Sequence, residues 1–352
     1  MKNELILQYL NQVVSDGASD IFIVAGGNIH EKVDKHIIPI SDNVLTSANT
    51  QQLIEELYDL AERPLDYLKT NGDDDFAISV SGLARFRVNA YKQRGSLAAT
   101  IRVVSFEIPD WRKLNIPKQV IELANVTSGL ILFTGTSGSG KSTTQACIID
   151  EINKNRDCHI ITLEDPIEFL HRNKKSLISQ REVSIDTKDY LTALKSCMRQ
   201  SPDVILLGEM RDHETIKTAM TASETGHLVI ATLHTKGAVN SVDRILDTFP
   251  SSQQSQIRMQ LSMILHTVVS QQLLPDVNGG LIPAYEVMHV NNAVRNLIRD
   301  NKSHQIDNTI ANDKTMISMD ESLVKLFREG KIKRETALLY TEHTEQLERK
   351  IS

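Results

Sequence analysis

A glycine-rich segment with a single lysine decides much of what this chain can fold into. Residues 135–142 read Gly-Thr-Ser-Gly-Ser-Gly-Lys-Ser. They follow an apolar, strand-like run at 130–134 and precede a helical pattern at 143–155. Strand, tight turn and helix in this order form the context that a phosphate-binding P-loop needs. The alternative is a glycine-rich turn without a ligand, which the joint match of spacing, lysine, serine and flanking elements disfavours.

The chemistry predicted for this loop follows from its residue types. Glycines let backbone N–H groups turn toward a phosphate, and the start of the following helix adds partial positive charge there. Lys141 would bridge the β- and γ-phosphates, and the Ser142 hydroxyl would be a ligand of Mg²⁺. The sequence therefore predicts a nucleoside-triphosphate site. Its expected binding residues are Thr136, Ser137, Gly138, Ser139, Gly140, Lys141, Ser142 and Thr143.

Two further apolar runs end in acidic residues. The run 159–163 leads into Glu164, and the run 204–207 leads into Gly208 and Glu209. Because parallel strands deliver functional groups at their carboxyl ends, Glu164 could polarise an attacking water. A helix cap is the alternative role for this carboxylate. Glu209 is expected to support Mg²⁺, although a glycine stands where a Walker B strand normally has an aspartate.

Two histidines flank a third apolar run, 228–232. His227 precedes this run and His234 follows it closely. A histidine at a strand end is commonly structural. A strand beside the P-loop could nevertheless place such a residue at the γ-phosphate, and His234 is the expected sensor of that phosphate.

The first hundred residues predict a separate α+β domain. Its predicted helices and strands cover 2–16, 21–24, 49–61, 76–80, 86–90 and 97–104, with Thr46 and Ser47 as candidate helix caps. Arg85 and Arg87 alternate with apolar residues, and Arg102 interrupts an apolar strand. Such arginines can simply mark a solvated strand face. In a ring of copies they could instead reach a neighbouring γ-phosphate.

The order of these patterns predicts two domains joined by a short linker. We expect an amino-terminal domain at 1–105, a proline-containing linker at 106–118 and a P-loop domain at 119–352. The last part of the P-loop domain, from about 290 to 352, is expected to be helical.

Length, charge and cysteine content limit the functional classes. A chain of 352 residues exceeds one ordinary domain, and its net charge of −6 argues against nonspecific nucleic-acid binding. Three widely spaced cysteines fit a reducing compartment and predict no zinc site. Neither a signal peptide nor a membrane-spanning run is evident. We therefore expect a cytoplasmic protein that touches a membrane only through a partner.

Four stretches together resemble one known family. Residues 135–142, 159–168, 204–212 and 222–234 resemble the Walker A, Asp box, Walker B and His box of the secretion ATPase superfamily, of the GspE/PilT type. Gly208-Glu209 is similar to the atypical Walker B of that family. Residues 293–299, Ala-Val-Arg-Asn-Leu-Ile-Arg, resemble a carboxyl-terminal motif of the branch that retracts type IV pili, with Val294 in place of the usual isoleucine.

The resemblance implies a fold class and an assembly. The fold class is α/β, with a RecA-like P-loop ATPase domain and a smaller, PAS-like α+β amino-terminal domain. The resemblance also implies a homohexamer that hydrolyses ATP with Mg²⁺, powers pilus retraction and docks on the inner-membrane platform protein of the pilus machine. It implies no nucleic-acid partner.

The resemblance also assigns roles to single residues. Glu164 would be the catalytic glutamate, Glu209 would support the metal with Ser142, and His227 with His234 would form the His-box pair. Arg87 and Arg102 would close on the nucleotide, with Arg85 as a less certain third. These implied catalytic residues are Glu164, Glu209, His234, His227, Arg87 and Arg102.

Other functions remain as alternatives. A pilus assembly or type II secretion ATPase of the same superfamily would usually carry a longer amino-terminal region, and many carry a tetracysteine zinc insertion. A nucleic-acid motor on the same core would require a basic tract and more aromatic residues than the eight Phe and one Trp present. A regulator that binds ATP without hydrolysis would not need Glu164 and Glu209.

Overall fold

The computed structural model describes residues 4–33, 36–104 and 106–351. The chain divides into two compact units. One holds the residues up to Glu107 together with Glu168–Leu170, and the other holds Ile108–Ile167 and the residues from His171 on. The predicted domain limits at residues 1, 105 and 352 lie outside the described residues. Within the described ranges, no helix is both long and apolar enough to cross a membrane.

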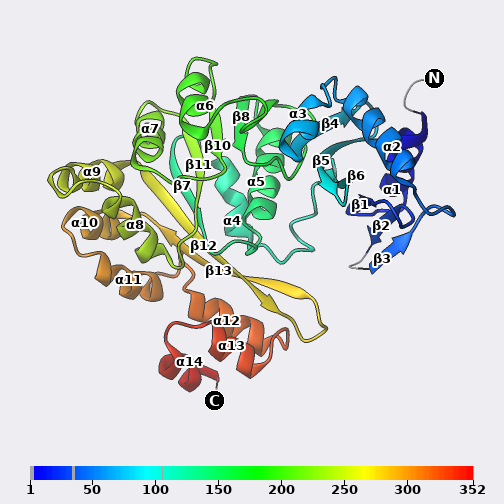
Figure 1. Cartoon of the computed structure of the whole chain (residues 1–352). Coiled ribbons are helices and arrows are strands. Elements are labelled where there is room, and N and C mark those ends of the chain that lie inside the picture. The colour runs from blue at the N-terminus through cyan, green and yellow to red at the C-terminus, as the bar shows by residue number, and fades with distance from the viewer. Residues whose placement is uncertain (1–3, 34–35, 105, 352) are drawn as a thin grey trace. The chain divides into compact units, whose positions relative to one another are not determined.

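The amino-terminal unit contains a six-stranded sheet in the order β3-β2-β1-β6-β5-β4 (Figure 1, blue to cyan). All of its neighbouring strands pair antiparallel. Its elements are α1 (Glu4–Ser15), β1 (Asp20–Ile23), β2 (His30–Val33), β3 (His36–Pro39), α2 (Ser47–Leu60), α3 (Asp66–Asn71), β4 (Asp73–Val80), β5 (Ala84–Gln93) and β6 (Ser96–Val104).

Hydrophobic alternation builds this unit. Along β5, Ala84, Phe86, Val88 and Ala90 are buried, and the residues between them are partly exposed, as the period of a strand requires. The helix predicted at 49–61 begins two residues earlier, because Thr46 caps it through a capping box with Asn49. The predicted α+β content is confirmed, but the sequence analysis missed β2 and β3. Their short segments combine charged and exposed residues and lack an alternating pattern.

The second unit is built on a seven-stranded sheet in the order β13-β12-β7-β11-β10-β8-β9. Six of these strands run parallel, and only the β12–β13 pair is antiparallel. The strands are β7 (Gly129–Thr134), β8 (His159–Glu164), β9 (Leu177–Glu182), β10 (Val204–Leu207), β11 (Leu228–Leu233), β12 (Leu265–Pro275) and β13 (Leu281–His289).

Helices cover both faces of this sheet, so alternate residues of β7 enter two different cores. Ile131 and Phe133 pack with the isoleucines of α5, and Leu130 and Leu132 pack on the opposite face with α6–α9. The helices of this part are α4 (Lys118–Ile121), η1 (Glu122–Asn125), α5 (Lys141–Asn155), α6 (Tyr190–Cys197), α7 (His213–Glu224), α8 (Ala238–Asp247) and α9 (Ser251–Ile264).

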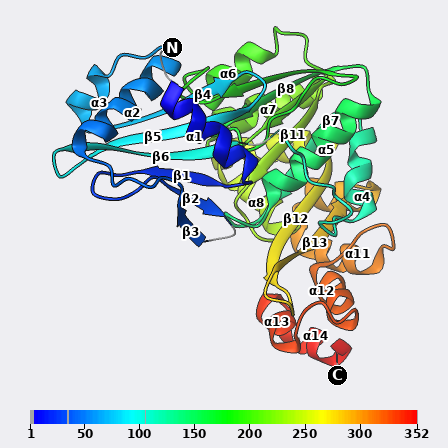
Figure 2. The same ribbon diagram turned by 90° about the vertical axis from the view of Figure 1, so that its right-hand side faces the viewer.

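The carboxyl-terminal segment is helical and has a small core of its own. Leu274 and Ile282, from β12 and β13, pack there against Leu323 and Leu347. Figures 1 and 2 both show β12 and β13 running from the sheet toward these helices. The helices are α10 (Asn292–Arg299), η2 (Ser303–Gln305), α11 (Ile306–Asn312), α12 (Met319–Arg328), α13 (Arg334–Tyr340) and α14 (Thr344–Ile351).

Most of the predicted linker belongs to the second unit. Ile108, Trp111 and Leu114 pack against the same core as α4 and α5, and the Cys147 thiol donates to the Pro109 carbonyl oxygen at 3.4 Å. The chain therefore passes from one unit to the other near residue 107, at the amino-terminal end of the expected segment.

Candidate functional site

The P-loop lies between the end of β7 and the start of α5. Gly135, Gly138 and Gly140 have φ angles of 140°, 77° and 86°, a region that side chains rarely adopt. Gly140 directly precedes α5, whose first residue is Lys141. These three conformations turn the chain tightly from strand to helix, so the first turn of α5 faces the loop.

Polar groups of the loop point inward and suit a phosphate. The Lys141 ammonium, with the residue 6% exposed, donates to the carbonyl oxygens of Gly135 and Thr136, each at 2.8 Å. Ser139 Oγ and Thr134 Oγ1 are buried and have no hydrogen-bond partner among the described residues. A phosphate oxygen would satisfy such a hydroxyl, because buried polar groups are normally hydrogen-bonded.

The remaining predicted binding residues form the rim of the loop. Thr136, Ser137 and Gly138 are exposed, whereas Ser142 and Thr143 are half-buried in the first turn of α5. The Ser142 hydroxyl therefore lies one residue beyond Lys141, at the positive end of the helix. The division of these residues into phosphate-binding and metal-binding groups stays a prediction.

Three other strands bring candidate residues to the same edge of the sheet. β8 ends at Glu164, β10 ends just before Gly208 and Glu209, and β11 ends just before His234. Because these strands and β7 are parallel neighbours, their carboxyl ends meet at one edge. Glu164 is half-buried, and its Oε1 accepts from Thr162 Oγ1 at 2.6 Å and from Gln180 Nε2 at 3.3 Å.

Glu209 and His234 are in contact. His234 Nε2 lies 3.2 Å from Glu209 Oε1, and Arg211 Nε lies 2.7 Å from Glu209 Oε2. The Glu209 side chain is 16% exposed, so its carboxylate is held between two basic groups with little solvent around it. The structure thus joins two residues whose roles were predicted separately, one for the metal and one for the γ-phosphate.

Steric contacts explain why a glycine, and not a residue with a side chain, occupies the Walker B position. A Cβ on Gly208 would lie 2.8 Å from the Tyr190 hydroxyl and 3.1 Å from the Leu163 carbonyl oxygen. Burial, followed by the nearby carboxylates of Asp165, Glu209 and Glu164, raises the pKa of Tyr190. Tyr190 therefore belongs to the polar cluster at this edge. The sequence analysis did not identify Tyr190 as a site residue, because the helical pattern around residue 190 does not indicate which strand its side chain packs against.

His227 lies at the other end of β11. Its Nδ1 is 2.9 Å from the Ala222 carbonyl oxygen and 3.1 Å from Thr225 Oγ1, and its own carbonyl oxygen accepts from Gly129 N. The six residues of β11 separate it from His234 by about 20 Å. Within one chain the structure therefore does not bring His227 to the P-loop. The catalytic role of His227 stays a prediction.

The predicted arginines belong to the amino-terminal unit. Arg87 on β5 stands opposite Arg102 on β6, and Arg102 Nε donates to Oδ1 of the buried Asp20 at 2.9 Å. Arg85 donates to Ser79 Oγ at 3.4 Å. Arg102 therefore has a structural ion pair in addition to its predicted role.

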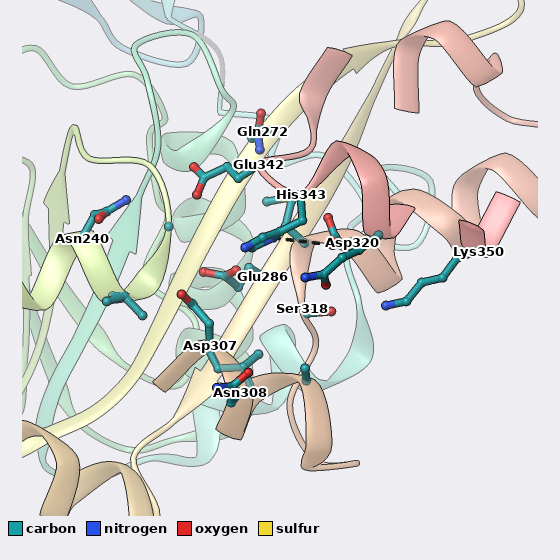
Figure 3. Close-up of a pocket in the computed structure, with 16 residues that line it drawn as sticks. Asn240, Gln272, Glu286, Asp307, Asn308, Ser318, Asp320, Glu342, His343 and Lys350 are labelled. Atoms are coloured by element: carbon teal, nitrogen blue, oxygen red, sulfur yellow. Dashed lines mark ion pairs between the residues drawn. The ribbon is translucent and has the colours of Figure 1, made fainter. Parts of the chain in front are cut away.

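A separate acidic hollow lies beside β13 and α8. It has a volume of about 200 Å³, and Figure 3 shows Glu286, Asp307, Glu342 and His343 at its walls. Among residues 4–33, 36–104 and 106–351, no three or more His, Cys, Asp or Glu side chains are arranged to hold a metal ion. The assignment of Mg²⁺ to Ser142 and Glu209 stays a prediction.

Residues 1–318 match the sequence family described as type II/IV secretion system protein. The chain belongs to this family. One similar secretion system protein is the type IV pilus retraction ATPase PilT of Pseudomonas aeruginosa, 40% identical over 336 residues that cover 94% of this chain and 96% of that protein. The type IV pilus ATPase PilU of the same species is 36% identical, covering 96% of this chain and 89% of its own.

A solved structure of a secretion system protein supports the same assignment. It is described as the pilus retraction motor PilT with bound ADP, and it is 44% identical to this chain. The match covers 98% of this chain and 99% of that structure, with a TM-score of 0.89. The predicted family and the predicted fold class, a RecA-like ATPase domain with a smaller amino-terminal domain, are confirmed. The PAS-like character of the smaller domain stays a prediction.

Proposed function

We propose that this chain is an ATP-hydrolysing motor that powers the retraction of type IV pili. The observation that carries the proposal is the meeting of a P-loop, Glu164, Glu209 and His234 at one edge of a parallel sheet. Its support is the likeness to a retraction motor that was solved with bound ADP.

The chain's own groups account for binding and for the attack by water. Backbone N–H groups of the loop and Lys141 bind the phosphates and counter their charge. The Thr162 hydroxyl orients the Glu164 carboxylate, which polarises a water for attack on the γ-phosphorus. We infer that His234, which contacts Glu209, responds to the loss of the γ-phosphate.

Mg²⁺ fits the donor set of this edge. The Ser142 hydroxyl and the Glu209 carboxylate are oxygen ligands of the kind that Mg²⁺ prefers, and Glu209 would act directly or through water. When bound, the ion would neutralise charge on the phosphate oxygens. The same carboxylate holds His234, so metal binding and phosphate sensing would share one side chain.

The working form is proposed to be a homohexamer. In it, Arg87 and Arg102 of the amino-terminal unit close on nucleotide, with Arg85 as a possible third contact, and phosphate release lets the two units pivot where the chain passes between them. The ring would work at the cytoplasmic face of the inner membrane. Its contact with the membrane would be indirect, through the platform protein of the pilus machine.

The decisive experiment separates retraction from assembly. Cells of the source organism that lack the gene are imaged for surface pili and tested for twitching. We expect many pili and no twitching, with both restored by the wild-type gene but not by a Glu164→Gln copy. Cells without pili would indicate an assembly motor instead. Unchanged pili and motility would contradict any role in this machine.

A further inference from the structure

The antiparallel strands β12 and β13 contact the P-loop and the end of the loop that follows His234. β12 pairs with β7 up to Ser270 and Thr134, so Gln271 stands beside the first residue of the P-loop. A Cβ on Gly135 would overlap the Gln271 carbonyl oxygen, and one on Gly140 would lie 2.9 Å from Gln271 Nε2. The two glycines thus let the P-loop pack directly on Gln271.

The Gln271 side chain also fastens the first turn of α5. Its Oε1 accepts from Thr144 Oγ1 at 2.9 Å, and the same hydroxyl lies 3.1 Å from the Tyr285 hydroxyl. Gln271 and Tyr285 are direct partners across β12 and β13. All three residues are at most 2% exposed. Thr144 follows Lys141 by three residues, so this buried network holds the helix that carries the phosphate-binding lysine.

The next pair along the same strands holds the loop that follows His234. Ser270 and Glu286 are cross-strand partners, and they point to the opposite face because side chains alternate along a strand. Ser270 Oγ accepts from Gly237 N at 3.0 Å, and Glu286 Oε1 accepts from Ala238 N at 2.6 Å. These amides form the start of α8. Figure 3 shows Glu286 on β13, with Asn240 on the neighbouring ribbon.

We propose that β12 and β13 act as a frame that sets the spacing of the P-loop and of the loop 234–237, with Gln271 as the positioning residue of the P-loop and Glu286 as that of the start of α8, where the loop 234–237 ends. Neither residue touches the reacting atoms. The two lie in neighbouring cross-strand pairs of β12 and β13, Gln271 with Tyr285 and Glu286 with Ser270. A shift of either strand would therefore change the distance between Lys141 and His234. The inference rests on the proposed nucleotide site.

The test for Gln271 uses a neighbour as its control. Gln271→Leu removes the buried acceptor of Thr144. Gln272→Leu makes the same change one residue on, where the side chain donates to the Tyr340 carbonyl oxygen. Steady-state phosphate release and titration with a fluorescent ADP analogue are measured on the full chain. We expect about a tenfold rise of KM and Kd for Gln271→Leu and changes within about twofold for Gln272→Leu.

The test for Glu286 uses a conservative variant. Glu286→Gln keeps an oxygen that accepts from Ala238 N, and Glu286→Leu does not. We expect Glu286→Leu to lower kcat about tenfold with little change in KM, and Glu286→Gln to stay within about twofold of the wild type. If Glu286→Leu does not fold, Ser270→Ala, which removes the acceptor of Gly237 N, should lower kcat in the same way by a smaller factor.

Some outcomes would overturn the frame. If Gln271→Leu and Gln272→Leu have the same kinetics, Gln271 does not position the P-loop. If Glu286→Leu and Glu286→Gln have the same kinetics, Glu286 does not position the start of α8. Binding of the ADP analogue to the wild-type chain tests the proposed function separately. Its absence would defeat that function whatever the variants show.

Discussion

Similar residues lie at the carboxyl ends and at the amino ends of the parallel strands of the seven-stranded sheet, but their surroundings differ. These two sides of the sheet are called the carboxyl edge and the amino edge. At the carboxyl edge, His234 contacts Glu209, whose other oxygen is held by Arg211. At the amino edge, the hydrogen-bond partners of the His227 ring within the described part of the chain are a backbone carbonyl and a threonine hydroxyl. Both histidines flank the same strand. The comparison teaches that strand direction, rather than residue type or nearness in sequence, decides which polar residue lies at the edge where β7 ends and the P-loop begins.

The first prediction concerns the carboxylate at the end of β8. Glu164→Gln removes the group that polarises water, so we expect kcat to fall about 10²–10⁴-fold while ADP affinity is kept. Phosphate release and ADP titration measure the two effects. Glu224→Gln, in the exposed last turn of α7 near the amino edge, is the matched control and should keep full turnover. Equal turnover in both variants would contradict the contrast between the edges.

The second prediction concerns the lysine of the P-loop. Lys141→Ala removes the cation nearest the loop carbonyl groups, and we expect kcat to fall about 10²–10³-fold with weaker ADP binding. Lys154→Ala lies on the same helix, where Lys154 pairs with Asp150 at 2.6 Å. It should spare nucleotide binding. A matching loss of binding in both variants would point to general damage of α5.

The third prediction concerns pH and Glu286. Burial above all, with Asp307 and Glu342 nearby, raises its pKa from 4.5 to about 7. The folded chain therefore binds more protons than the unfolded chain between these values, and the free energy of unfolding falls as pH rises through them. The span corresponds to on the order of 3 kcal/mol. His343, Asp320 and Lys350 also line the hollow and contribute to its field.

Denaturation by urea at about pH 5 and about pH 8 measures this dependence. Glu286→Gln should flatten it. Gln272→Leu changes the same hollow without adding or removing a titrating group, so it should leave the dependence as in the wild type. A Glu286→Gln chain with unchanged pH dependence would show that this carboxyl group does not titrate in the expected range.

The sequence predicted the structure correctly where a motif and the strand and helix that flank it lie close together in the chain. The strand, turn and helix around Lys141 were predicted correctly, because glycines, lysine and flanking periodicity all occur within about 25 residues. Glu164 and His234 were placed correctly for a related reason. They follow apolar runs, and the rule that parallel strands end at one edge brings them together.

What the sequence missed depends on contacts between distant segments. Gln271 and Thr144 form a hydrogen bond although they are 127 positions apart in the sequence. The Tyr190 hydroxyl, which leaves no room for a side chain at Gly208, comes from α6. No local pattern indicates either contact. His227 precedes β11 in the sequence, so it lies at the opposite end of that strand from His234.

The smallest predicted difference tests the central claim most directly. Phosphate release is compared between His234→Ala and His227→Ala, two identical changes at the two ends of β11. We predict that His234→Ala lowers kcat at least tenfold, since a hydrogen bond involving a charged group is worth about 1.5–3 kcal/mol. His227→Ala should stay within about twofold of the wild type. An equal loss in both variants, or a larger loss for His227→Ala, would contradict the claim that the carboxyl edge alone carries the reaction.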